Sequence, residues 1–92
     1  MSRPPAITVI IVAYNSGAYL QPCVDALSRQ SFEDFEAVIV DNASTDGAVE
    51  ALSLPDDRFR VDRPGENLGF AGANNRVARA VTSPWIALLN PD

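Results

Sequence analysis

The chain has 92 residues, of which 47% are hydrophobic, so it is long enough for one small domain and too apolar for a disordered segment. It carries 7 basic and 12 acidic residues, and its formal net charge is −5. Every cation is an arginine and no basic stripe is present, which argues against binding to a nucleic acid. The chain has no histidine, and this removes the usual general base and the commonest zinc ligand.

Targeting signals are weak in this sequence. Residues 7–13 form an apolar run that is far too short to span a membrane, and residues 2–5 before it make a poor signal peptide. Cys23 is the single cysteine, so no internal disulfide can form, and we expect a small buried side chain on a helix. We therefore expect a cytoplasmic protein without a membrane span.

The first half of the chain predicts a strand, a helix and a second strand. Residues 7–13 are β-branched and almost wholly apolar, which is typical of a strand buried on both faces. Residues 18–30 carry apolar side chains at helical spacing, and Pro22 places the start of the regular helix late in this stretch. Residues 35–40 predict the second buried strand.

The second half repeats this alternation. After a polar loop at residues 41–47, Ser44 or Thr45 is expected to cap a short helix that reaches Leu52. Residues 59–61 predict a brief third strand, residues 70–81 a further helix, and residues 85–89 a fourth buried strand.

This order, β-α-β-α-β-α-β, predicts an α/β fold: a Rossmann-like open, mainly parallel sheet with helices on both faces. The last residues follow a strand that no further helix covers. We therefore expect residues 1–92 to form one half of a larger domain, truncated after its last motif.

Polar side chains follow three of the predicted strands. Tyr14 and Asn15 follow the first, Asp41 and Asn42 the second, and residues 90–92 the fourth. Each alone is an ordinary turn residue. Together they favour a site, because ligands of open α/β sheets bind outside the carboxyl ends of the strands.

Two nucleotide-binding motifs are missing. A dinucleotide fold needs Gly-x-Gly-x-x-Gly directly after the first strand, and residues 13–17 contain one glycine. A P-loop needs a lysine, and the chain has none. An NAD-dependent oxidoreductase and an ordinary ATPase are therefore disfavoured.

Ordered motifs give the chain a resemblance to family 2 glycosyltransferases. They are residues 7–15 followed by Tyr19-Leu20, residues 30–32 (QSF), residues 38–47 (VIVDNASTDG), residues 67–75 (NLGFAGANN) and residues 88–92 (LLNPD). The last two segments are similar to those of the branch with bacterial rhamnosyltransferase-like enzymes. The resemblance covers nearly the whole chain.

The resemblance implies the N-terminal half of a type-A glycosyltransferase fold. Such an enzyme transfers a sugar, with inversion, from a nucleoside-diphosphate sugar (UDP- or dTDP-linked) to an acceptor hydroxyl. It implies nucleotide-sugar contacts by Val12, Ala13, Tyr14, Asn15, Asp41, Asn42, Asp46, Asn67 and Asn74.

Three of these assignments carry a physical argument. The Tyr14 ring either stacks on the base or packs on a helix. Asn42 stands where many relatives have an acid, and its amide can still pair with a pyrimidine edge because it both donates and accepts. Asp46 either contacts the nucleotide or caps the following helix, where a carboxylate is favoured.

The resemblance also implies a divalent cation, Mg²⁺ or Mn²⁺, at Asp92. Asn90 replaces the first acid of the family's metal motif, so we expect weak cation binding without the nucleotide. The catalytic base and the site for a glycan or lipid-linked acceptor are expected beyond residue 92, in a full-length protein that could act at the inner face of the membrane. We expect these 92 residues alone to transfer no sugar. Two alternatives stay open: a non-catalytic nucleotide-binding fragment, and a doubly wound domain with another ligand.

Overall fold

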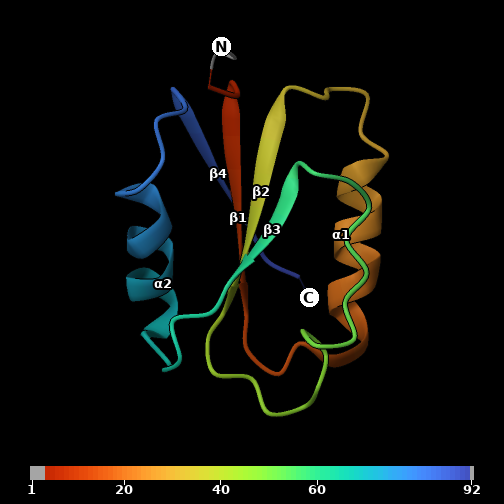
Figure 1. Ribbon diagram of the computed structural model, residues 1–92, viewed down its shortest axis with the longest axis vertical. Helices are drawn as coiled ribbons and strands as arrows, with labels where there is room; N and C mark the ends of the chain where they lie inside the picture. The colour runs from red at the N-terminus through yellow and green to blue at the C-terminus, as the bar shows by residue number, and fades with distance from the viewer. Residues whose placement is uncertain (1–3, 92) are drawn as a thin grey trace.

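The computed structural model describes residues 4–91 and shows the predicted α/β fold (Figure 1). All strand pairs are parallel, and the sheet order is β3-β2-β1-β4. Within the described residues, no helix is long and apolar enough to cross a bilayer. The elements are β1 (Ile7–Ala13), the 3₁₀ turn η1 (Gly17–Tyr19), α1 (Leu20–Ser28), β2 (Phe35–Asp41), β3 (Phe59–Asp62), α2 (Gly69–Ala78) and β4 (Trp85–Leu89).

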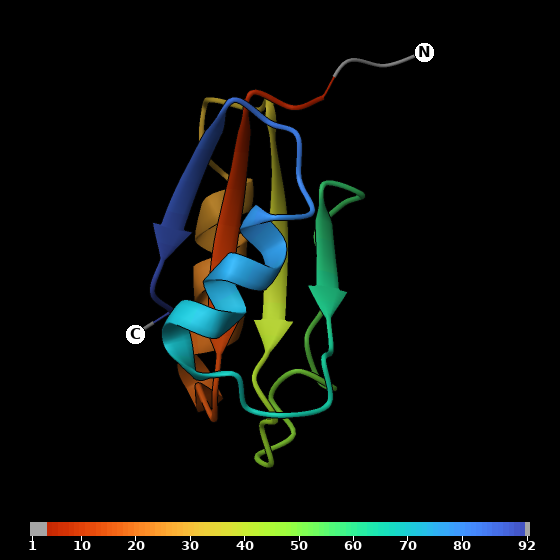
Figure 2. The ribbon, with the colours of Figure 1, turned by 90° about the vertical axis from the view of Figure 1, so that its left-hand side faces the viewer.

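The two central strands, β1 and β2, are apolar on both sides, and a helix lies against each face of the sheet (Figures 1 and 2). Strand β1 pairs with β2 from Ile7↔Phe35 to Ala13↔Asp41. Because parallel partners end together, the polar residues after β1 and β2 come to the same edge of the sheet.

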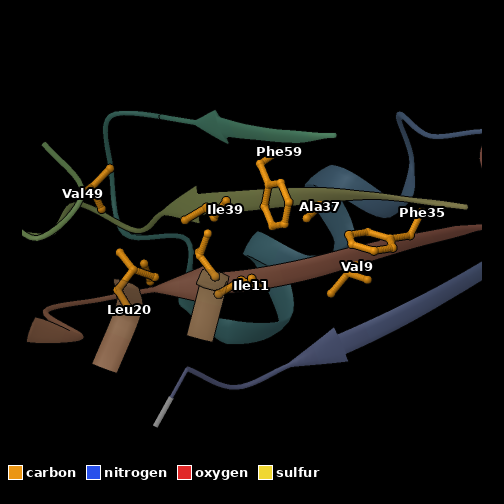
Figure 3. Packing of buried hydrophobic residues seen from close by; sticks show 10 residues of the cluster. Val9, Ile11, Leu20, Phe35, Ala37, Ile39, Val49 and Phe59 are labelled. Atoms are coloured by element: carbon orange, nitrogen blue, oxygen red, sulfur yellow. The ribbon is translucent and has the colours of Figure 1, made fainter. Parts of the chain in front are cut away.

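Two clusters of buried side chains hold the helices to the sheet. The cluster under α1 is the larger, and several of its members are drawn in Figure 3. The strand residues of the cluster under α2 alternate along β1 and β2 with those of the first cluster, and its other members come from α2 itself. The first includes Val9, Ile11, Leu20, Val24 and Ile39, and the second consists of Ile10, Val38, Val40, Ala73 and Val77.

The predicted helix from Ser44 or Thr45 to Leu52 is wrong. The segment contains a turn at residues 48–51 instead, with Ala51 N–H donating to the Gly47 carbonyl (3.1 Å). The next free N–H group, that of Ser53, donates to Gln21 Oε1 on α1 (2.8 Å) and not to a backbone carbonyl of its own segment. The Leu52 N–H also donates to the Val49 carbonyl (3.1 Å), and two such turn bonds are too few to stabilise a helix, because the first turn is costly to form.

The prediction that residues 85–89 are a buried strand is also wrong. The strand forms as expected, but all five residues of β4 are exposed, and 71% of the Trp85 surface is accessible to solvent. The cause is its position at the edge of the sheet: α1 and α2 cover the central strands and leave both faces of β4 open within the described residues.

A bidentate ion pair between Asp62 and Arg76 joins the end of β3 to α2, with N–O distances of 2.7 and 3.1 Å. The Arg76 hydrogen bonds lower the pKa of the Asp62 carboxyl against a smaller opposing effect of burial. A lowered folded-state pKa stabilises the fold above the ordinary value of 3.8, and this contribution is lost as pH falls through the lowered pKa.

Arg76→Gln is therefore expected to make the acid side of the stability curve shallower, with a small effect at neutral pH because the pair is partly exposed. Urea denaturation at a series of pH values from about 6 down to 2 measures this. Arg79→Gln removes the same charge one turn later and is the control. An equal change of slope in both variants would mean that net charge, and not this pair, sets the slope.

Candidate functional site

An open cleft of about 570 Å³ lies at the carboxyl ends of β1 and β2, beside the start of α2. In Figures 1 and 2 the loops after these strands and the first turn of α2 lie together at the lower end of the sheet. The cleft is lined by Val12, Tyr14, Asn15, Ser16, Gly17, Ala18, Tyr19, Asn42, Asn67, Gly69, Phe70, Asn90 and Pro91.

The lining combines exposed rings with neutral amides. Tyr14, Tyr19 and Phe70 each keep more than half of their surface exposed. Aromatic faces can stack on a planar ligand, and amides can pair with its polar edge. None of the described lining residues carries a formal charge. The arrangement therefore suits a planar, hydrogen-bonding group better than it suits direct charge pairing.

The structure brings together five of the residues that the sequence predicts for the site: Val12, Tyr14, Asn15, Asn42 and Asn67. Tyr14 is 55% exposed, so its ring is available to a ligand. The other predicted residues lie behind the lining or outside it, namely Ala13, Asp41, Asp46 and Asn74. Asp92 lies outside the described residues.

The Asn42 side chain is almost fully buried and is held by backbone groups at the start of α2. Its Oδ1 accepts from the Leu68 N–H (2.7 Å), and its Nδ2 donates to the Gly69 carbonyl (3.2 Å). These two bonds need one acceptor and one donor. An amide has both, whereas an ionised carboxylate has acceptors only. The role predicted for Asn42 at a base edge stays a prediction, but the fold itself accounts for an amide here.

Asp41 is also buried and does not line the cleft. Its Oδ1 accepts from the Ser44 N–H (2.9 Å), and its Oδ2 pairs with the Arg63 guanidinium (3.2 Å). Glu50 also binds Arg63 (3.1 Å), and Glu50 first and Asp41 second raise the pKa of this guanidinium. The sequence analysis did not predict a role for Arg63. Its position directly after the third strand, where ligands of such sheets bind, was the one signal that could have indicated it.

Asp46 does not cap a helix, because the residues that follow it, 48–51, form a turn. Its Oδ2 accepts from the Gly17 N–H (2.9 Å) and its Oδ1 from the Ala48 N–H (3.1 Å). Asp46 therefore links the loop after β2 to the loop after β1.

The first turn of α2 forms one side of the cleft. Asn67 Oδ1 accepts from the Gly69 N–H (2.8 Å), and Gly69 has φ +73°, a conformation that favours glycine. Asn74 lies one turn further along α2, where its Nδ2 donates to the Phe70 carbonyl (3.0 Å). Its Oδ1 is buried without a hydrogen-bond partner among the described residues.

Several lining residues were missed by the sequence reasoning: Ser16, Gly17, Ala18, Tyr19, Gly69, Phe70 and Pro91. Most of them lie in the quoted motifs, but nothing in residue type separated those that face the cleft from their neighbours. The exposure of Tyr19 and Phe70 depends on how η1 and α2 leave the sheet, which no local pattern shows.

The predicted metal site lies only partly within the described residues. Asn90 lines the cleft, whereas residues 4–91 contain no group of three or more carboxylates, thiols or imidazoles that could hold a cation. The oxygen donors Asn90 and Asp92 fit a hard divalent cation in kind, and such a cation takes several more oxygen ligands. Asp92 as a ligand stays a prediction.

Comparison with known proteins identifies the sequence family. Residues 8–92 match the family model described as glycosyl transferase family 2. The chain is 32% identical over 89 residues to the glycosyltransferase GlyG of Streptococcus pneumoniae, covering 94% of this chain and 30% of that protein. It is 36% identical over 94 residues to validoxylamine A glucosyltransferase of Streptomyces hygroscopicus subsp. jinggangensis, covering 97% and 22%.

A solved structure agrees with this result. The mannosyltransferase PcManGT of Pyrobaculum calidifontis, solved in complex with GDP-Man and Mn²⁺, superposes with a TM-score of 0.86 at 28% identity, covering 99% of this chain and 28% of that one. The chain thus spans between about a fifth and a third of the length of these relatives.

Proposed function

Because the chain belongs to glycosyl transferase family 2, we propose that its cleft binds the donor, a nucleoside-diphosphate sugar, for an inverting glycosyltransferase. The observation that carries the proposal is the cleft itself: exposed rings and neutral amides gather at the carboxyl ends of β1 and β2, where ligands of open α/β sheets bind. The likeness to a mannosyltransferase solved with a nucleotide sugar supports it.

Base recognition is assigned to Tyr14 and the amides around it. The exposed Tyr14 ring is assigned to stacking on the base, and Asn15 and Asn42 line the same cleft. We propose a UDP- or dTDP-linked donor, as the resemblance to family 2 glycosyltransferases implies. Because PcManGT was solved with a guanine nucleotide, the test includes one.

The diphosphate is assigned to the start of α2. Backbone N–H groups in the first turn of a helix attract anions, and Gly69 and Phe70 line the cleft there. With no charged residue in the described lining, the remaining negative charge would be matched by a divalent cation, which Asp92 and Asn90 would hold together with phosphate oxygens. The cation, when bound, acts as a Lewis acid on the leaving diphosphate.

The 92 residues are proposed to be the donor-binding part of a longer enzyme. The proposed transfer needs a base for the acceptor hydroxyl, and we assign that base and the acceptor site to the part of the enzyme beyond residue 92. We propose a glycan or lipid-linked acceptor, and a relative that is 33% identical, named as the succinoglycan biosynthesis protein ExoO of Rhizobium meliloti, supports a role in glycan synthesis.

Isothermal titration calorimetry of the 92-residue chain tests the proposal with UDP-glucose, dTDP-rhamnose and GDP-mannose, each with and without Mn²⁺. Saturable binding of at least one nucleotide sugar is expected. Tyr14→Phe keeps the ring and should bind like the wild type, whereas Tyr14→Ala should bind more weakly. If ATP bound with the same heat as every nucleotide sugar, the result would favour a doubly wound domain with another ligand. No binding of any kind would contradict the proposal.

Mn²⁺ binding should depend on the nucleotide. We expect weak binding of Mn²⁺ alone, because Asn90 stands where a second carboxylate would be needed, and tighter binding when a nucleotide sugar supplies phosphate oxygens. Asp92→Asn should remove this enhancement in a calorimetric titration, while Asp57→Asn, an exposed acid in the loop before β3, should not. Tight Mn²⁺ binding by the free chain would contradict the assignment.

A further inference from the structure

We propose that Asp46 is a positioning residue, which holds the cleft wall of residues 14–19 in place from outside the cleft lining and does not touch the nucleotide. The inference rests on the proposed function, since the wall matters only if the cleft binds a nucleotide sugar.

The wall is one continuous segment, and every residue from Tyr14 to Tyr19 lines the cleft. Two of its residues have positive φ, Asn15 at 47° and Gly17 at 53°. A non-glycine residue in this region is strained and persists only where its surroundings hold it. The 3₁₀ turn that closes the wall also has no side-chain cap at Ser16. The wall therefore depends on support from outside the segment.

That support comes from three consecutive residues after β2, Ser44, Thr45 and Asp46, which we call the brace. Ser44 Oγ accepts from the Asn15 N–H (3.1 Å), and the Thr45 N–H donates to Asn15 Oδ1 (2.8 Å). Asp46 Oδ2 accepts from the Gly17 N–H (2.9 Å). No brace residue lines the cleft, so the wall is held by residues that lie outside the cleft lining.

Asp46 supplies the carboxylate among these contacts, from a position that is exposed to solvent. A carboxylate that accepts from a backbone N–H forms a charge-assisted bond, which is about twice as strong as a neutral one. Its second oxygen accepts from the Ala48 N–H (3.1 Å), which fixes the side chain in this orientation. A carboxylate would also repel a diphosphate at close range, so a place outside the cleft lining suits an anionic ligand better than a place in the cleft.

The brace is itself anchored in the fold. The Ser44 N–H donates to Asp41 Oδ1 (2.9 Å), and Asp41 is buried and paired with Arg63 beyond the end of β3. Ser44 Oγ also donates to the Ala13 carbonyl at the end of β1 (3.3 Å). The position of the wall is therefore set relative to the sheet.

Two measurements on Asp46→Ala, Asp46→Asn and the control Asp57→Ala test this inference. The first is amide hydrogen exchange at Gly17 by NMR without ligand. The second is calorimetric Kd for UDP-glucose, dTDP-rhamnose and GDP-mannose with Mn²⁺. Asp46→Ala should speed exchange at Gly17 and raise Kd, each by about tenfold. Asp46→Asn keeps one carboxamide oxygen and should lie between Asp46→Ala and the wild type. Asp57→Ala removes the same charge from an exposed loop and should change neither quantity.

The outcomes separate this inference from the proposed function. A higher Kd with unchanged hydrogen exchange at Gly17 would show that Asp46 contacts the ligand. This result would overturn the inference and leave the proposed function standing. Faster exchange with unchanged Kd would also overturn it, because the wall would then not control binding. If the wild type binds none of the three nucleotide sugars, the proposed function fails and the inference fails with it.

Discussion

Replacing Ile39 by alanine is expected to lower the free energy of unfolding by about 2–5 kcal/mol. Ile39 lies at the centre of β2, has no exposed surface, and packs in the cluster under α1 (Figure 3). Truncation removes three carbon atoms from this cluster and leaves a cavity that neighbours on two strands cannot close without moving the sheet. Urea denaturation followed by far-ultraviolet circular dichroism measures the loss.

Ile86→Ala is the matched control, because it is the same substitution in a strand of the same sheet. Ile86 is 43% exposed on β4, so a loss within about 1 kcal/mol is expected. The pair of variants also tests the exposure of β4. If Ile86→Ala cost as much as Ile39→Ala, the faces of β4 would have to be covered in solution, contrary to the structure.

Replacing Asn42 by alanine is expected to lower stability by about 1–3 kcal/mol, since it removes the partners of two backbone groups at the start of α2. These groups are the Leu68 N–H and the Gly69 carbonyl. Asn42→Asp keeps an acceptor for Leu68 but loses the donor to Gly69 and places a charge in a buried position. We expect both variants to weaken nucleotide-sugar binding as well, because Gly69 and Phe70 line the cleft.

Hydrogen exchange and calorimetry together identify the cause of these losses. Faster exchange at Leu68 in Asn42→Ala would show that the start of α2 has loosened. Asn75→Ala, an exposed asparagine on the same helix, is the control and should leave stability and binding near the wild-type values. Weaker binding by Asn42→Ala with unchanged exchange at Leu68 would mean that the Asn42 amide acts on the ligand and not through α2.

Part of the candidate site followed from the chain alone. Parallel strands that start in register bring their carboxyl ends to one edge, so the residues after β1 and β2 were expected to meet, and Tyr14, Asn15 and Asn42 do line one cleft. Which of their neighbours turn toward the cleft could not be predicted. Asp41 and Asn42 are adjacent polar residues, yet Asp41 pairs with Arg63 outside the cleft lining and Asn42 binds the start of α2.

The strands themselves were determined by sequence-local physics. β-branched runs such as residues 7–13 favour a strand over a helix, and apolar side chains on both faces are typical of central strands, which β1 and β2 are. Sequence-local reasoning failed where several partners compete for one backbone group. The turn at residues 48–51 has helix-compatible residues, but Gln21 of α1 takes up the Ser53 N–H that a helix would use.

Tertiary structure alone decided the burial of β4 and the role of Asp46. An apolar strand is buried only when helices or further strands pack against it. Strand β4 pairs with the side of β1 that β2 does not occupy, and it is the edge strand of the described sheet. A carboxylate binds whichever N–H group the fold brings near, and for Asp46 that included Gly17, 29 residues away in the chain. Local composition thus determined which segments form the sheet, while long-range contacts determined which polar groups support the cleft and which face it.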